Sequence, residues 1–297
     1  MQVFQLDLEP GHPPRFLQFD PTGRFLVAGW RPTFLIDTNA GGPPTRALSG
    51  YPGGSLAFAR GGQRLAFVGT SVGFLAWYDL TTGGGFDRKF DGIWIRSLVV
   101  HPDGETVFVS VGGYGLQTEG EVRVLRLDDF EERAVIRTDA GNVGALALSA
   151  DGNWLAGASG VFVRVWSVGV GRFAARARRR VEPDGYFSGF ALSPDGSTLA
   201  VASSRGFAAW DVASGAQLFK SGKHRRALVE VACAPDRPLF ATGDNAGGVF
   251  LWDATGRVLN KYDWGLGCVA KLAFAPDGLR CAAMDVSGKV VVWDVDE

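Results

Sequence analysis

The sequence is poor in the residues that usually carry metal or redox chemistry. Among its 297 residues there are three cysteines, at Cys233, Cys268 and Cys281, and three histidines, at His12, His101 and His224. The cysteines are an odd, sparse set without metal-ligand spacing, which argues against a disulfide framework and favours buried free thiols in a reducing compartment. The histidines have no second ligand nearby in the sequence. We therefore expect no metal and no cofactor.

Long apolar runs and an excess of charge of one sign are also lacking. No apolar run approaches the ~20 residues that a membrane span needs. The segment Met1 to Leu8 has no basic region followed by a long apolar core, so it does not read as a secretory signal. The 30 basic and 31 acidic side chains give a net charge of −1 and no general attraction to nucleic acid or anionic membrane. These features predict a cytoplasmic protein that does not enter a membrane.

Glycine, in contrast, is abundant. The chain has 42 glycines, well above the roughly 7% of ordinary proteins. They stand singly and in pairs between short apolar runs, which indicates many tight turns rather than a flexible tail. The high glycine and arginine content, with few lysines, also suggests a bacterial source with a GC-rich genome.

A repeat runs through the whole sequence. Each unit has an apolar strand, a turn resembling Pro-Asp-Gly, a second strand of small or apolar residues and a third strand. The turns are Asp20–Gly23, Ala59–Gly62, His101–Gly104, Ser149–Gly152, Ser193–Gly196, Ala234–Arg237 and Ala275–Gly278. Their last residues are 39, 42, 48, 44, 41 and 41 residues apart. This period predicts seven similar units in one domain over residues 1–297, with turn centres near 22, 61, 103, 151, 195, 236 and 277.

The pattern within each unit favours β-strands. Before the turns, apolar residues alternate, as in Leu146-Ala-Leu148 and Leu272-Ala-Phe274. Proline followed by Asp and Gly sets the first turn dihedral and then permits a positive φ. The small residues after the turn, as in Leu199-Ala-Val-Ala202, would suit a strand that is covered on both faces.

Three of the third strands end in Trp-Asp, at Trp210-Asp211, Trp252-Asp253 and Trp293-Asp294. With the repeat length, these dipeptides make the chain resemble the WD-repeat (beta-transducin-like) β-propeller family. The resemblance covers nearly the whole chain and is strongest over residues 187–297; blades one and three have Ile36-Asp37 and Leu127-Asp128 instead. It implies an all-β, seven-bladed propeller of four-stranded antiparallel blades that acts as a non-catalytic protein-binding scaffold.

The ends of the sequence fit this architecture. The last unit stops after its third strand, and the segment Val3 to Leu8 is a strand without a unit of its own. Pairing of this first strand with the last blade would close the ring and remove two exposed edges. We also expect His224, Thr242, Asp244 and Trp252 to form the buried hydrogen-bonded network that the resemblance implies.

Aromatic residues are predicted to gather at one mouth of the propeller. The segments entering the first strands, and the loops after the second strands, would lie on this face. The expected partner-binding residues there are Trp30, Tyr51, Trp94, Arg96, Tyr114, Tyr186, Trp264 and Lys271, with Arg15 nearby. Tyrosine, tryptophan and arginine are enriched in interface hot spots. The alternative is that some of these rings pack between blades.

A basic sector supports a second hypothesis. Its candidate anion-binding residues are Arg176, Arg178, Arg180, Arg225 and Arg226. Strand alternation would place Arg176, Arg178 and Arg180 on one face. Such a cluster could bind nucleic acid or an acidic ligand, although charge on an outer strand also prevents edge-to-edge association.

Two enzyme-like motifs lack the context that their chemistry requires. Gly69-Thr-Ser-Val-Gly73 matches a hydrolase nucleophile elbow, and Gly169-Val-Gly-Arg-Phe-Ala174 matches a dinucleotide fingerprint. Both motifs need a strand that leads into a helix, whereas these segments join predicted strands. We therefore expect a monomeric, non-catalytic protein; an active site at the central channel is the remaining, less favoured alternative.

Overall fold

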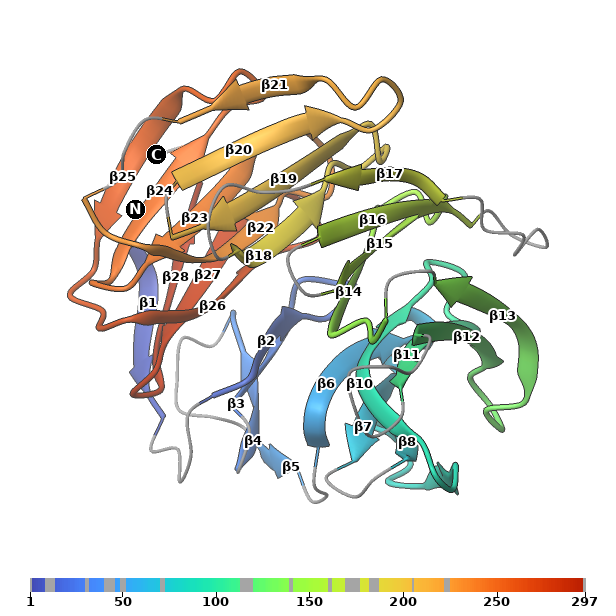
Figure 1. Cartoon of the computed structure of the whole chain (residues 1–297). Coiled ribbons are helices and arrows are strands. Elements are labelled where there is room, and N and C mark those ends of the chain that lie inside the picture. The colour runs from blue at the N-terminus through green and yellow to red at the C-terminus, as the bar shows by residue number, and fades with distance from the viewer. Residues whose placement is uncertain are drawn as a thin grey trace. The chain divides into compact units, whose positions relative to one another are not determined.

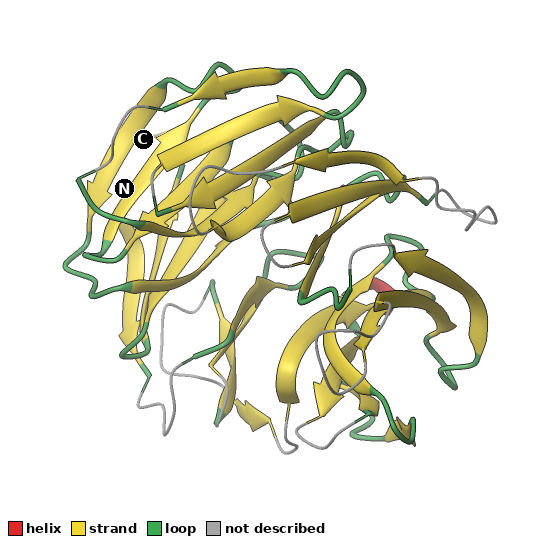
Figure 2. Cartoon of the chain, viewed as in Figure 1, coloured by secondary structure: helices red, strands yellow, loops and turns green. Residues whose placement is uncertain are grey.

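The computed structural model describes residues 2–8, 14–29, 32–39, 46–48, 52–69, 73–112, 120–138, 141–159, 162–168, 177–181, 187–204, 206–221 and 225–295. Within these residues nearly all regular structure is β-strand, as Figure 2 shows, and the one helical element is a single 3-10 turn at Arg60–Gly62. In the same part of the chain, no helix is long and apolar enough to cross a membrane.

In the described part of the chain, 28 strands form seven four-stranded antiparallel sheets, which we call blades 1 to 7. Blade 1 holds β2 (Phe16–Phe19), β3 (Phe25–Gly29), β4 (Thr33–Asp37) and β5 (Arg46–Leu48). Blade 2 holds β6 (Pro52–Ala59), β7 (Arg64–Gly69), β8 (Phe74–Asp79) and β9 (Gly85–Lys89). Blade 3 holds β10 (Trp94–Val100), β11 (Thr106–Gly112), β12 (Gly120–Arg126) and β13 (Glu132–Thr138).

The remaining blades repeat this plan. Blade 4 holds β14 (Ala145–Leu148), β15 (Trp154–Ser159), β16 (Phe162–Ser167) and β17 (Ala177–Val181). Blade 5 holds β18 (Phe187–Leu192), β19 (Thr198–Ser203), β20 (Gly206–Asp211) and β21 (Gln217–Lys220). Blade 6 holds β22 (Leu228–Cys233), β23 (Phe240–Asp244), β24 (Gly248–Trp252) and β25 (Val258–Asp263). Blade 7 holds β26 (Val269–Phe274), β27 (Arg280–Asp285), β28 (Lys289–Asp294) and β1 (Gln2–Asp7).

Six blades consist of four consecutive strands, and blade 7 takes its fourth strand from the other end of the sequence. β1 runs antiparallel to β28, with Gln5 opposite Val291 and Asp7 opposite Lys289. The predicted pairing of the first strand with the last blade is therefore confirmed, and the fold class is that of a seven-bladed β-propeller.

The turns between first and second strands explain why the repeat is regular. In blade 3 the N–H of Gly104 donates to the carbonyl of His101 at 2.9 Å, and Gly104 has a φ of +72°. At Gly278 a second reason for glycine appears, because a Cβ there would lie 2.2 Å from Oδ1 of Asp236 in the turn of blade 6. The turn of one blade thus nests against that of the next.

Within each unit, the hydrophobic core lies between neighbouring blades. One buried cluster joins blades 6 and 7 and includes Leu251, Trp293 and Ala283, the last two without exposed surface. The second strands are small or apolar and almost fully covered, as in β27, where Ala282 and Met284 are also inaccessible. This burial explains the runs of small residues that follow each turn in the sequence.

The strands pack into two compact units. One contains residues 1–50 and 183–297, which are blades 1, 5, 6 and 7, and the other contains residues 51–182, which are blades 2, 3 and 4. Figure 1 labels the strands of both units.

Candidate functional site

In the unit of residues 51–182, the start of the innermost strand of blade 3 places two predicted partner-binding residues together. Trp94, half-buried, opens β10 opposite Gly112, and Arg96 follows two residues later as an exposed side chain. The pairing of β10 with β11 shifts between Ile95 and Ser97, so Arg96 is the extra residue of a β-bulge. Bulges turn a side chain away from the ladder, which is why Arg96 faces solvent on a strand whose other residues are buried or half-buried.

The next residues hold this bulge in place. The hydroxyl of Ser97 accepts the backbone N–H of Leu146, on the innermost strand of blade 4, at 3.1 Å. The backbone N–H of Ser97 in turn donates to Oγ of Ser110 at 3.1 Å. A site on a strand with such support is more rigid than one on a loop. Trp94 and Arg96 therefore combine an apolar surface and a positive charge on a fixed backbone.

The same bulge recurs in the other unit. The pairing of the first and second strands shifts at Phe187/Gly189 in blade 5, Leu228/Glu230 in blade 6 and Val269/Lys271 in blade 7. Each shift leaves one extra residue at the same place as Arg96 in its blade. The bulge is thus a backbone feature that several blades share. Blade 3 differs from the other three in carrying an arginine at the extra position.

The remaining members of the predicted aromatic mouth have different surroundings. Trp30, Tyr51, Tyr114 and Tyr186 lie outside the described residues. Trp264 stacks on Tyr262, with ring centroids 5.6 Å apart and planes 11° apart, and lies 6.2 Å from Trp293. It packs against the buried cluster between blades 6 and 7, and its indole N–H has no acceptor among the described residues. These contacts show that the Trp264 ring packs between blades 6 and 7. A role for Trp264 in partner binding stays a prediction.

The charged residues predicted near this mouth differ in their contacts. The ammonium group of Lys271 on β26 pairs with the carboxylate of Glu230 on β22, which links the innermost strands of blades 6 and 7. Arg15 is exposed just before β2, and its backbone N–H donates to the carbonyl of Gly29 at 3.0 Å. Lys271 is therefore already neutralised by a neighbouring blade.

The backbone of the basic sector departs from simple strand alternation. Arg176 lies outside the described residues, and Arg178 and Arg180 lie on β17, of which the backbone is described. Arg179 is opposite Val165 and Ala177 is opposite Trp166, so Arg178 is the extra residue of a bulge. The bulge interrupts the period of two on which the predicted shared face depends, and that shared face stays a prediction. Arg225 and Arg226 are exposed ahead of β22, in the other unit.

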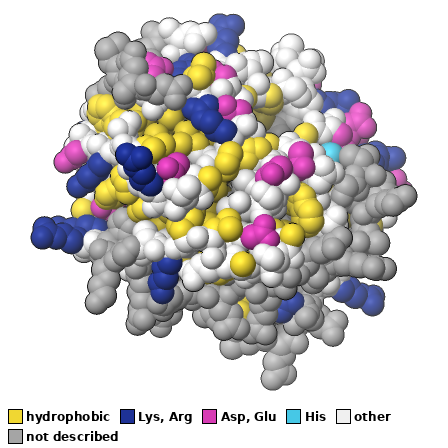
Figure 3. Space-filling view, turned by 90° about the horizontal axis from the view of Figure 1, so that it is seen from above, with side chains coloured by type: hydrophobic (Ala, Val, Ile, Leu, Met, Phe, Trp, Pro, Cys, Tyr) yellow, Lys and Arg dark blue, Asp and Glu magenta, His cyan; other side chains and the backbone are white. Residues whose placement is uncertain are grey.

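Charge is mixed on the face that Figure 3 shows. Lysine and arginine side chains are interspersed there with acidic and apolar ones rather than gathered by sign. This distribution agrees with the near-zero net charge of the sequence.

Part of the predicted buried network of blade 6 is present. The indole N–H of Trp252 donates to Oγ1 of Thr242 at 2.8 Å, and both residues are buried. Oδ1 of Asp244 accepts the backbone N–H groups of Ala246 at 2.8 Å and Gly248 at 2.9 Å, so this carboxylate holds the turn between β23 and β24. His224 lies outside the described residues.

Blade 7 has a related carboxylate, Asp285. Its Oδ1 accepts the N–H groups of Ser287 and Lys289 at 2.8 and 3.0 Å, and its Oδ2 accepts the N–H of Gly267 at 2.8 Å. Burial alone would raise the pKa of Asp285, but these bonds and the one from the Ser287 hydroxyl outweigh burial and lower the pKa below 3.8. Asp285 thereby joins the turn after β27 to the segment that enters β26.

The lowered pKa gives Asp285 a predictable pH effect. Because its folded pKa lies below the unfolded value, its stabilisation is complete above about pH 4 and is lost as the pH falls through the folded pKa. Substitution D285N should therefore lower the free energy of unfolding at about pH 6 much more than at about pH 3. Urea titrations of both proteins at the two pH values measure this difference. An equal loss at both would mean that the charge of Asp285 is not responsible.

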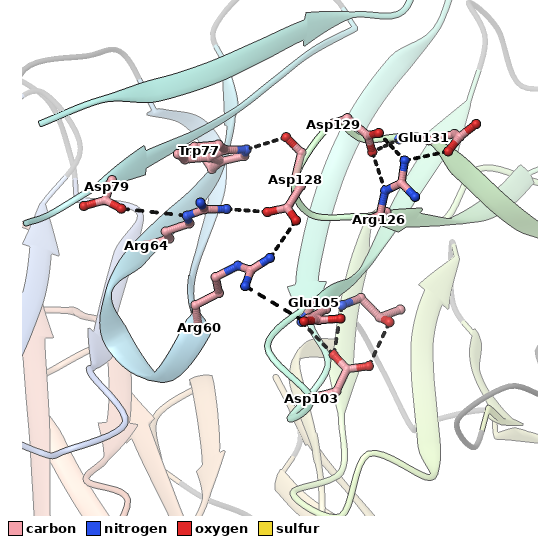
Figure 4. A network of polar contacts seen from close by, with 11 residues as sticks. Arg60, Arg64, Trp77, Asp79, Asp103, Glu105, Arg126, Asp128, Asp129 and Glu131 are labelled. Atoms are coloured by element: carbon pink, nitrogen blue, oxygen red, sulfur yellow. Dashed lines mark hydrogen bonds and ion pairs between the residues drawn. The ribbon is translucent and has the colours of Figure 1, made fainter. Parts of the chain in front are cut away.

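An ionic network links blades 2 and 3, as Figure 4 shows. Asp128 accepts hydrogen bonds from Arg60 at 2.6 Å and from Arg64 at 2.5 Å, and its backbone carbonyl accepts the indole N–H of Trp77 at 3.1 Å. The guanidinium of Arg64 also lies over the Trp77 ring, 3.8 Å from its centroid. Burial would raise the pKa of Asp128, and the bonds from Arg64 and Arg60 lower it instead. The network stabilises the contact between the two blades.

The neighbouring acidic residues continue this network. The hydrogen bond from Arg126 to Asp129 is the main cause that lowers the pKa of Asp129 to about 2. Arg126 also reaches Glu131 at 2.7 Å. Sequence reasoning missed the network because its partners are separated by up to 68 residues. The only local signal is the unusual turn Ala59-Arg-Gly-Gly62, in which Arg60 has a positive φ of 48°.

The thiols are poor nucleophiles in this fold. Burial raises the pKa of Cys233 to about 12 and also raises the pKa values of Cys268 and Cys281. The thiolate is the reactive form, so these side chains stay protonated at neutral pH. Across the described part of the chain, no group of three His, Cys, Asp or Glu residues could hold a metal ion. Ser71 and the segment 169–174 lie outside it.

Comparison with protein-family models and with curated proteins gives no match to this sequence.

Proposed function

We propose that this protein is a non-catalytic scaffold of the WD-repeat type, which binds a partner protein or peptide in the cytoplasm of a bacterium. Propeller folds commonly serve as protein-interaction scaffolds. The observation that supports this function best is the pair Trp94 and Arg96 at the start of β10. A half-buried tryptophan beside an arginine that a bulge turns into solvent is a combination typical of interface hot spots.

The surroundings of the pair support binding rather than catalysis. General acid–base catalysis needs a titratable group with a tuned pKa beside the reacting atoms. On β10 the side chains around Arg96 are apolar or hydroxyl-bearing, and the hydroxyl of Ser97 is engaged by Leu146. The geometry instead offers one ring for apolar contact and one guanidinium for an acidic group or a backbone carbonyl of a partner.

Replacing the two residues should abolish partner capture. We expect W94A/R96E to weaken binding by ~30-fold or more, because truncation of hot-spot residues costs about 2 kcal/mol or more. The measurement is an affinity pull-down from the source cells, followed by mass spectrometry and by titration of the captured partner.

The matched control is R133A, which removes an exposed arginine from a bulge on the outer strand of the same blade. It should capture the partner as the unmodified protein does. Equal capture by W94A/R96E and R133A would contradict the proposed site, provided that thermal melts show all three proteins folded.

A further inference from the structure

The outer strands of four blades carry a β-bulge at an equivalent position. In each, the pairing of the third and fourth strands shifts by one residue, and the extra residues are Arg133, Arg178, Leu218 and Leu259. A bulge on an edge strand interrupts the ladder, and a charged residue there discourages association with other strands. Blades 3 and 4 follow this rule with arginine. Blades 5 and 6 instead carry leucine at the extra position.

The two leucines are strongly exposed. Leu218 on β21 is 50% exposed and Leu259 on β25 is 46% exposed, and Val258 beside Leu259 is 41% exposed. Three of the seven large apolar side chains that are exposed among the described residues thus lie on these two short strands. Single exposed apolar residues need no explanation, but a repeated group on one region indicates an interaction surface.

The turn before β25 packs against β21 at the seam between blades 5 and 6. A Cβ at Gly256, in the turn that leads into β25, would lie 2.4 Å from the Phe219 ring on β21. Phe219 is opposite Ala209 and Val258 is opposite Trp252. Ala209 and Trp252 belong to the one buried cluster that joins these blades. Phe219 and Val258 therefore face the seam from its two sides.

Positive charge borders this apolar surface. Lys220 and Lys261 are exposed two residues after the respective leucines, and Arg257 is exposed directly before Val258. The ammonium group of Lys261 lies 5.5 Å from the ring centroid of Phe250, which packs against the same cluster. The pattern Leu-x-Lys thus occurs in both strands, at the same place relative to the bulge.

The acidic residues that flank β25 are engaged locally. Oδ1 of Asp253 accepts the N–H groups of Thr255 at 2.8 Å and Arg257 at 3.0 Å. Oδ1 of Asp263 accepts the N–H of Gly265 at 3.1 Å. These carboxylates keep their charge but lie six and four residues from Leu259 along the chain, whereas Arg257 and Lys261 lie two residues from it on either side, so the charges nearest to Leu259 in the sequence are positive.

We propose that Leu218, Phe219, Val258, Leu259 and Lys261, which we call the rim patch, form a docking surface for an acidic, leucine-bearing segment of another protein. Apolar side chains of the segment would cover the leucines, and its carboxylates would pair with Lys261. A second copy of this chain would bring lysine against lysine in a self-complementary contact, so charge disfavours that occupant. The rim patch lies in the unit that does not contain Trp94 and Arg96, so it is independent of the proposed function.

The test uses a short fluorescein-labelled peptide of alternating leucine and glutamate, titrated with the full chain at low salt. We expect saturable binding that weakens as salt is added. L218S/L259S should weaken binding at least about tenfold, since each buried leucine contributes more than the free energy of a tenfold change. K261E should weaken it by a similar factor.

The matched control is L279S, because Leu279 is 51% exposed in the same unit, on the turn of blade 7. It should bind the peptide as the unmodified chain does, and all variants should keep the melting temperature. The proposal is overturned by any of three results. The first is that the leucine–glutamate peptide does not bind at ~1 mM. The second is that a leucine–lysine peptide binds as tightly as the leucine–glutamate peptide. The third is that the chain associates with itself and that L218S/L259S abolishes this association.

Discussion

Deletion of residues 1–8 lowers the melting temperature by about 10 °C or more, or prevents folding altogether. This is the expected result because β1 is the fourth strand of blade 7. Its loss removes the strand pairing of β28, whose Val290, Val291 and Val292 are inaccessible in the intact fold. It also removes Leu8, which is 5% exposed within the cluster between blades 7 and 1. Burial of each leucine contributes about 1.5–3 kcal/mol, against a total stability of about 5–15 kcal/mol.

The measurement is a thermal melt followed by circular dichroism, with and without a synthetic peptide of residues 1–8. Added peptide should restore part of the lost stability in a concentration-dependent way, because it binds only the folded chain. The single variant L8D, which places a charge in the same cluster, should act in the same direction. A deleted protein that melts within about two degrees of the full chain would show that β1 is dispensable.

Substitution T242V is expected to cost about 1–3 kcal/mol of the free energy of unfolding. Valine has nearly the shape of threonine, so packing is kept while the indole N–H of Trp252 loses its acceptor in a buried site. An unsatisfied buried donor carries the full penalty of its lost hydration. Urea unfolding should show a lower midpoint concentration, while the slope of the free energy of unfolding against urea concentration should stay the same.

Blade 7 supplies the comparison for this substitution. By strand register Ala283 takes the place of Thr242 there, and the indole N–H of Trp293 is buried without an acceptor among the described residues. A283S offers that N–H a hydroxyl and should raise the free energy of unfolding by up to about 1 kcal/mol. If T242V proves neutral, the bond between Trp252 and Thr242 does not contribute to stability, and A283S should then bring no gain.

The features set by short-range patterns were predictable from the sequence. Seven turns at a regular spacing predicted seven blades, because Pro-Asp-Gly and its variants fix turn dihedrals locally. The unpaired first strand predicted the partner of β28, since a four-stranded plan left one place empty in blade 7. The alternation before each turn gave the correct strands for the same local reason.

The features that depend on a single extra residue were not predictable. The bulge at Arg178 leaves no mark in composition, so the sequence predicts unbroken alternation along residues 176–180. Asp128 accepts bonds from Arg60 and Arg64 on the neighbouring blade. Such pairs depend on how blades are placed in space, which residue spacing does not reveal. Trp264 packs against Trp293 for a related reason, because a segment between blades is covered by both.

The construction of blade 7 from both ends of the sequence also sets an order of assembly during synthesis. β1 is made long before its partner β28, which is completed only when residue 294 has been added. At translation rates of about 5–20 residues per second, β1 waits for tens of seconds with both edges unpaired. The unit of residues 51–182 is continuous in the sequence and needs no such delay. Its blades should therefore form on the ribosome, while the blade that joins the two ends forms last and governs when the whole chain becomes resistant to proteases.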